Sequence, residues 1–117
     1  MTLDLTVWHD LGHDHSMKFF TWDPDLSINP QYAHLAHLIQ EHPVVGCSIK
    51  HKKADGSDCR GAIHFDTPLM RSGPFKQYET KYLWTVHSWE PLHVEPSLLC
   101  NACGDHGHIR EGKWVPA

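Results

Sequence analysis

The sequence predicts a β-rich α+β fold with a small antiparallel sheet, one helix over about residues 30–41, and a C-terminal half that resembles a zinc knuckle or ribbon. Three observations predict it. Short runs of β-branched and aromatic residues are separated by turn residues, a single segment carries helix signals, and Cys100 and Cys103 have the spacing of a metal knuckle. Because 117 residues are enough for one domain and few for two, we expect a single zinc-stabilised domain over residues 1–117.

The N-terminal part of the chain predicts two strands. Residues 2–8 alternate between apolar and polar side chains, which is typical of a half-buried strand. Residues 9–16 are polar and predict a loop. Residues 17–22 are rich in aromatic side chains and predict the second strand.

The segment that begins at Asn29 carries the signals of a helix. Asn29 is a favourable N-cap, and Pro30 is favoured at the first helical position. The helix is expected to end near Glu41, because the residue before Pro43 is restricted to extended conformations. Its apolar face consists of Tyr32, Leu35, Ala36 and Ile39.

The middle of the chain predicts a β-hairpin and a further strand. Residues 44–50 and 59–65 flank a polar turn at 54–58, which indicates an antiparallel pair. Residues 66–77 contain two prolines and a glycine and predict a loop. Residues 81–89 form the strongest β segment of the chain, since they combine aromatic and β-branched side chains.

The C-terminal end predicts a second hairpin. Two prolines bracket a short extended piece at residues 92–95. After the cysteine pair, residues 108–110 and 113–115 flank Glu111-Gly112, a dipeptide suited to a tight turn.

The composition narrows the classes of function. Hydrophobic residues make up 40% and charged residues 21%, as in soluble globular proteins. No apolar run approaches the ~20 residues that span a bilayer, and the N-terminus lacks a leader pattern, so we expect no membrane partner and a cytosolic location. The net charge is −4, and the short basic run at 50–53 is interpreted as a solvated loop, which disfavours a nucleic-acid partner.

The cysteines indicate a metal site. A Cys-x2-Cys pair in a chain with twelve histidines favours metal binding over disulfides. The two-residue gap aims both sulfurs at one ion, and Gly104 lets the backbone turn beneath it. Zinc prefers four thiolate and imidazole ligands in closed structural sites, so zinc is the predicted cofactor.

The predicted ligand set is Cys59, Cys100, Cys103 and His106, in which Cys59 comes from the middle hairpin and His106 from the knuckle itself. Two alternatives remain open. Cys47 would replace His106 in a site of four thiolates, although its apolar neighbours favour a buried, inert thiol. His108 lies two residues beyond His106 and is the other alternative ligand.

A second site is conceivable near the N-terminus. His9, His13 and His15, with the intervening aspartates, are the residue types of hydrolytic metal centres. No further segment supplies matching ligands, so a polar loop is the favoured interpretation. No nucleophile–base pair and no glycine-rich phosphate loop occur in the sequence.

A family resemblance is carried by the C-terminal third of the chain. Its residues are Trp89, Pro91-Leu92, Pro96-Ser97-Leu98-Leu99-Cys100, Cys103-Gly104, His106-Gly107, Ile109-Arg110, Gly112 and Trp114, with Cys59–Phe65 as an upstream match. This pattern resembles small zinc-binding proteins of bacteriophages of actinobacteria. The resemblance implies a zinc-bound β fold and a phage or prophage origin, and by position it supports Cys59, Cys100, Cys103 and His106 as ligands.

Two functions follow as expectations. The first is a non-enzymatic phage accessory protein that serves as a structural or protein-binding module in the virion or as an inhibitor of a host system. Its location would be the virion or the host cytoplasm, and its partner a host or virion protein. The alternative is a metal-dependent hydrolase or nuclease that uses the cluster from His9 to His15.

Overall fold

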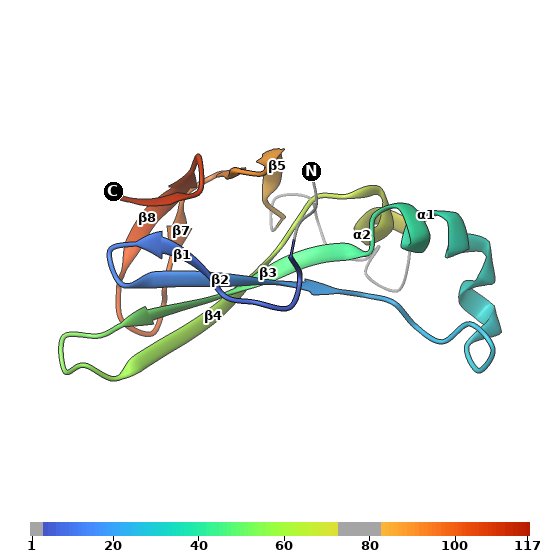
Figure 1. Ribbon diagram of the computed structural model, residues 1–117, viewed down its shortest axis with the longest axis horizontal. Coiled ribbons are helices and arrows are strands. Elements are labelled where there is room, and N and C mark those ends of the chain that lie inside the picture. Colours follow the sequence, from blue (N-terminus) through green and yellow to red (C-terminus); the bar gives the residue numbers. More distant parts are fainter. Residues whose placement is uncertain (1–3, 73–82) are drawn as a thin grey trace.

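The computed structural model describes residues 4–72 and 83–117. Its elements in chain order are β1 (His9–Gly12), β2 (His15–Thr21), the 3-10 helix η1 (Pro30–Leu35), α1 (Ala36–Glu41), β3 (Val44–Lys52), β4 (Asp58–His64), α2 (Pro68–Ser72), β5 (Thr85–Trp89), β6 (Leu92–Glu95), β7 (Leu98–Leu99), β8 (His106–Arg110) and β9 (Lys113–Pro116). The predicted β-rich α+β class is confirmed (Figure 1).

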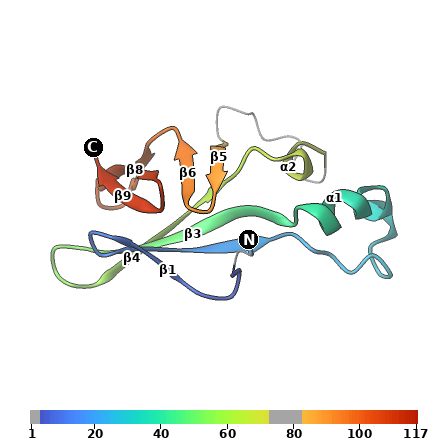
Figure 2. The same cartoon turned by 45° about the horizontal axis from the view of Figure 1, so that its top comes forward.

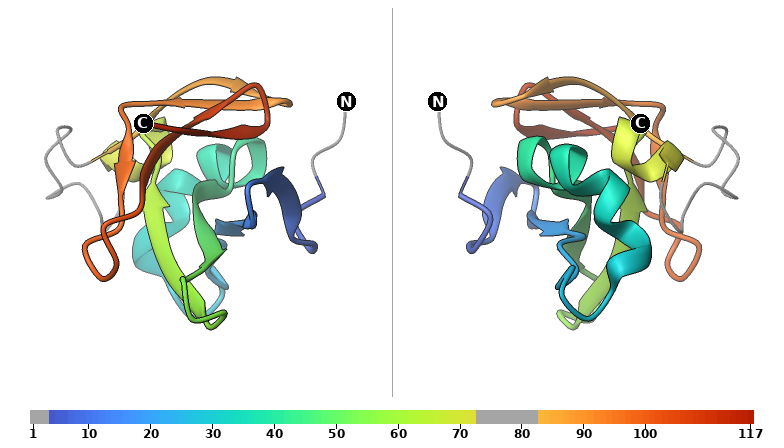
Figure 3. Two further views of the ribbon diagram at one scale, coloured as in Figure 1. Left: turned by 90° about the vertical axis from the view of Figure 1, so that its left-hand side faces the viewer. Right: turned by 90° about the vertical axis from the view of Figure 1, so that its right-hand side faces the viewer.

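The strands form three antiparallel sheets. The largest has the order β1-β2-β3-β4, a second pairs β5 with β6, and the third has the order β7-β8-β9. The strands from β5 to β9 lie over one face of the four-stranded sheet, and the helices lie at one end of it (Figures 2 and 3). This layering encloses the core and brings the end of the chain onto the middle hairpin.

The predicted strand over residues 2–8 is wrong for its described part. Residues 5–7 form bends, and residues 4 and 8 have no regular secondary structure, while residues 1–3 lie outside the described residues. The Asp4 carboxylate accepts hydrogen bonds from the backbone N–H and the hydroxyl of Thr6, at 2.9 and 2.6 Å. Such an aspartate turn competes with strand pairing and overrides the alternating pattern.

The predicted loop over residues 9–16 is instead a tight hairpin between β1 and β2. Gly12 pairs with His15, and the two residues between them, His13 and Asp14, have φ values of 53° and 59°. Two consecutive residues with positive φ are the geometry of a tight hairpin turn, which suits the right-handed twist of the strands. The polar composition of this segment concealed its strands.

The remaining elements follow the sequence closely. The predicted helix is found over residues 30–41, with its first half as a 3-10 helix. The middle and terminal hairpins are confirmed as β3–β4 and β8–β9, and the predicted strand over 81–89 is found from Thr85 onward. Residues 81 and 82 lie outside the described residues.

The short helix α2 falls in a segment predicted to be a loop. Thr67 accepts a hydrogen bond from the Met70 backbone N–H through its hydroxyl, at 3.3 Å, and so caps the helix. The cap precedes Pro68, which suits the first helical turn. Among the described residues, no helix is long and apolar enough to cross a membrane.

The core lies between the four-stranded sheet and the C-terminal strands. Phe65, Val94 and Ile109 are fully buried there and pack with the buried face of β2 and β3. A second cluster, under the helices, centres on Leu69 and Met70. The first cluster borders the candidate metal centre described next.

Candidate metal centre

The middle hairpin supplies two donor side chains from adjacent strands. In the register of β3 and β4, His51 is the direct partner of Cys59. Directly opposed residues point to the same face of a sheet, and both side chains lie on the buried face, each 5% exposed. The hairpin therefore presents an imidazole and a thiol side by side toward the C-terminal half.

The loop of residues 100–105, which we term the knuckle loop, supplies two more donors. The Gly104 N–H donates to the Cys100 carbonyl oxygen at 2.7 Å, and the Cys100 N–H donates to the Asp105 carbonyl oxygen at 2.8 Å. Gly104 has φ of 80°, which residues other than glycine rarely adopt. This tight turn directs the Cys100 and Cys103 thiols to the same side.

The four donor atoms of His51, Cys59, Cys100 and Cys103 converge, since they all lie within 4.8 Å of one another. Cys59 Sγ lies 3.5 Å from Cys100 Sγ, and His51 Nε2 lies 3.0 Å from Cys103 Sγ. A tetrahedral zinc ion with bonds of ~2.3 Å to sulfur and ~2.0 Å to nitrogen separates its donors by about 3.5–3.8 Å. The observed spacing is close to that of a bound tetrahedral ion.

The thiols of the cluster influence one another's protonation. Hydrogen bonding to Cys100 and burial raise the pKa of Cys59 to about 11. Burial opposes ionisation of Cys100 as well, but hydrogen bonds from Cys59 and Cys103 outweigh it and lower the pKa of Cys100. The cluster therefore contains one thiol that its neighbours favour as thiolate, and thiolate is the form that binds metal.

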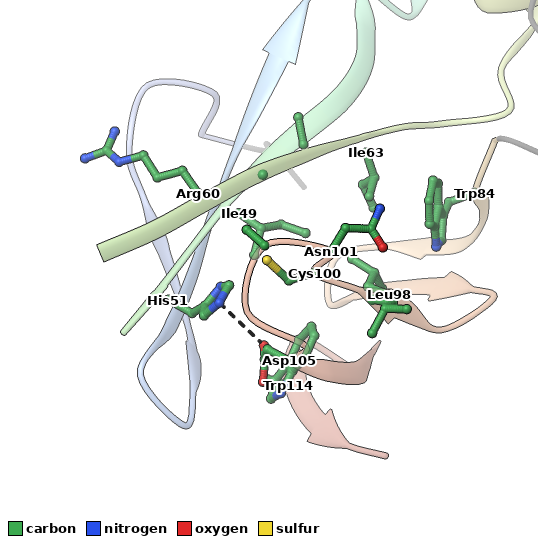
Figure 4. Close-up of a pocket in the computed structure, with 14 residues that line it drawn as sticks. Ile49, His51, Arg60, Ile63, Trp84, Leu98, Cys100, Asn101, Asp105 and Trp114 are labelled. Carbon is green, nitrogen blue, oxygen red and sulfur yellow. Dashed lines mark ion pairs between the residues drawn. The ribbon is translucent and has the colours of Figure 1, made fainter. Parts of the chain in front are cut away.

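Asp105 and His15 anchor the knuckle loop to the sheet. His15, on β2, is 5% exposed, and its Nε2 lies 2.6 Å from Asp105 Oδ2. Its ring is stacked between Trp114, with centroids 4.1 Å apart, and His51, with centroids 5.1 Å apart. The same carboxylate oxygen lies 4.0 Å from His51 Nε2 (Figure 4). These contacts fix the plane of the His51 ring and the position of the loop beside it.

The structure brings together three of the four predicted ligands. Cys59, Cys100 and Cys103 converge, but His106 does not join them, and His51 lies where a fourth ligand was expected. His106 begins β8, where it pairs with Leu99, and its Nε2 lies 2.9 Å from Ser97 Oγ at the surface. The His106 ring thus contacts Ser97 and is not part of the donor group.

The two alternative ligands lie outside the cluster. Cys47 is fully buried in the core, between its β2 partner Phe19 and its β4 partner Ile63. Burial raises its pKa to about 12, which keeps the thiol protonated. His108 lies on β8, and its Nδ1 is buried with no hydrogen-bond partner among the described residues.

The three histidines of the predicted second site have separate environments. His9 Nε2 lies 2.8 Å from the Asp4 carbonyl oxygen, and His13 is exposed in the turn of the first hairpin. His15 instead faces Asp105 and His51, with which it forms a second group of close donors. Within residues 4–72 and 83–117, His9 and His13 belong to no such group.

Comparison of the chain with models of known protein families, with curated proteins and with solved structures finds no match. The assignment of a metal centre accordingly depends on the geometry of the donors.

Proposed function

We propose that this protein is a zinc-stabilised, non-enzymatic module that binds another protein. One Zn²⁺ ion, held by His51, Cys59, Cys100 and Cys103, would join the knuckle loop to the middle hairpin. The observation that carries the proposal is the convergence of one imidazole and three thiols from three segments of the chain.

The donor chemistry supports zinc as the metal. Soft thiolates with one imidazole in tetrahedral arrangement are typical of structural zinc sites, whereas oxygen-rich donors suit magnesium and calcium. A catalytic zinc site requires an open coordination position for water or substrate, and four protein ligands leave none. A structural role for the ion follows from this closed coordination.

The biological setting is proposed from the sequence resemblance. The likeness of the C-terminal segment to small phage proteins supports a role in the virion or as an inhibitor of a host system, with the protein located in the virion or the host cytoplasm. The net charge of −4 supports a protein partner over a nucleic acid, because nucleic-acid binding depends on clustered lysine and arginine contacts with phosphates.

The test compares two histidine variants that differ in position but not in chemistry. Zinc content per chain is measured by elemental analysis on wild-type protein, His51→Ala and His106→Ala, each purified without added metal. We expect one zinc per chain in the wild type and in His106→Ala. His51→Ala is expected to lose most of its zinc in the presence of a competing chelator.

Equal zinc retention by the two variants would show that the fourth ligand is misassigned. A wild-type protein that binds no zinc, whether purified from cells or refolded with the metal, would overturn the proposed function.

A further inference from the structure

A groove of about 340 Å³ lies beside the metal centre, between β4 and the segment from Leu98 to Ala102 (Figure 4). Apolar side chains line most of it, among them Ile49, Ile63 and Trp84. Two residues of the metal centre, His51 and Cys100, line one end. Mostly apolar concavities of this size, with a few polar groups, are where proteins take up ligand groups.

One wall of the groove is the outer edge of the four-stranded sheet. β4 is an outer strand. The Phe65 N–H bonds inward to the Val45 carbonyl oxygen at 2.8 Å, so odd-numbered residues of this stretch pair with β3. The even-numbered residues face away from β3, as seen at His64, whose carbonyl oxygen accepts the Trp84 N–H at 2.9 Å.

Farther along the same edge, Arg60 and Ala62 present their backbone groups to the groove. No described residue bonds to the backbone N–H or C=O of either one. The Arg60 guanidinium lies 5.9 Å from the Trp8 ring on the opposite face of the sheet, so it is the backbone of Arg60 that borders the groove. An unpaired strand edge is a template for another extended chain.

Gly61 leaves a hole in the floor of the groove. Its direct partner is Ile49, and it lies between Cys59 and Ile63 on the buried face of β4. A Cβ atom built at Gly61 would meet no atom within 4 Å. The position that would carry an inward side chain is therefore open space within the groove.

We propose that this groove binds an extended segment of the partner protein, which adds to the edge of β4 and places one bulky apolar side chain over Gly61. The free N–H and C=O groups of Arg60 and Ala62 require an extended backbone as their complement, and the hole at Gly61 requires an aliphatic or aromatic side chain. The chain itself already uses this edge, because Trp84 bridges to Phe65 in parallel and accepts the Asp66 N–H at 2.8 Å. The inference rests on the proposed function, since the metal would hold the knuckle loop in place as the second wall.

The test uses a display library of random peptides of about ten residues, long enough to form one strand. The library is selected on zinc-loaded wild-type protein, and the enriched peptides are synthesised with a fluorophore for titration. Amide chemical shifts of the protein report where each peptide binds. We expect enriched peptides to share one bulky apolar residue and to shift the amides of Arg60 and Ala62.

Two substitutions separate the groove from the opposite face of the hairpin. Gly61→Leu places a side chain in the hole, whereas Ser48→Leu adds the same side chain on the opposite face, at a β3 residue that does not line the groove. We expect the peptides to bind Ser48→Leu as they bind the wild type, and Gly61→Leu at least about tenfold more weakly, a loss of the size found for central interface residues. If Gly61→Leu fails to retain zinc, Gly61→Val, which suits a strand, replaces it.

Three results would overturn the inference: no enriched peptide, equal binding to the filled variant, or shifts confined to another surface. The proposed function is tested independently, because the zinc content of the same samples is measured without peptide. If the wild type holds one zinc ion per chain but no peptide binds in the groove, the proposed zinc module stands and only the proposed peptide site is refuted.

Discussion

Replacement of Cys59 by alanine should lower the thermal midpoint by about 16 °C or more. Cys59 and Cys100 are 41 positions apart in the sequence, so a metal bridge between them closes a loop of that length. A cross-link of this kind removes about 13 cal/mol/K of chain entropy from the unfolded state, or about 4 kcal/mol at 25 °C. A 117-residue chain unfolds with about 0.25 kcal/mol/K, which converts 4 kcal/mol into about 16 °C.

This figure assumes that Cys59→Ala loses the ion, and it counts only the loop between Cys59 and Cys100. The assay is the circular-dichroism melt of wild type, Cys59→Ala and the control Cys47→Ala, each with and without a zinc chelator. The chelator should lower the midpoint of the wild type and of Cys47→Ala but leave that of Cys59→Ala unchanged. A zinc-free Cys59→Ala that melts within a few degrees of the zinc-loaded wild type would refute the cross-link argument.

Three further predictions concern the packing at Gly46, the contact of His15 with the knuckle loop, and the ion pair of Asp66 with Arg71. Gly46→Ala should lower the free energy of unfolding, measured in urea, by roughly 1–3 kcal/mol, because its Cβ would lie 2.3 Å from a carbonyl oxygen of β4. Gly61→Ala is the control and should lower it by nothing, because its Cβ would meet no atom within 4 Å. Equal losses in the two variants would contradict the packing. His15→Phe keeps the ring stack but removes the hydrogen bond to the knuckle loop, so zinc affinity measured by chelator competition should fall about 10–100-fold. The ion pair with Arg71 lowers the pKa of Asp66, so the small advantage of wild type over Asp66→Asn should be full at neutral pH and should be lost in acid, as the pH falls below the ordinary pKa of an aspartate. An advantage that persists in acid would exclude the ion pair as its source.

Local signals in the sequence were sufficient for much of the fold and for three of the four side chains that converge in the candidate metal centre. The pair of cysteines with Gly104 specifies its own turn, and the loop hydrogen bonds follow from three neighbouring residues. The helix start at Pro30 and both long hairpins are also encoded by adjacent residues. Where a short-range contact competed with the pattern, as Asp4 does with the predicted N-terminal strand, the pattern misled.

The fourth donor was missed because it depends on a long-range register. The sequence predicts the two strands of the middle hairpin over residues 44–50 and 59–65, so the first predicted strand ends one residue before His51. In the structure the turn closes at Lys53 and Ser57, whose backbone groups bond at 2.8 Å, and this places His51 opposite Cys59. A polar turn of several residues allows more than one closure, so the sequence alone does not fix which histidine faces the cysteine.

That register is determined from both faces of the hairpin. On the outer face, Lys50 pairs with Arg60, and both cations lie near the Trp8 ring, at 4.5 and 5.9 Å from its centroid. A slip of one residue in either strand would turn its cation into the apolar core, where an unpaired charge is costly, and would expose the histidine or cysteine beside it. A slip of β4 by one residue would also turn the Gly61 position to the opposite face, away from the floor of the groove. The metal centre and the groove are therefore adjacent for one reason: the turn that aligns His51 with Cys59 also sets which backbone groups of β4 remain free.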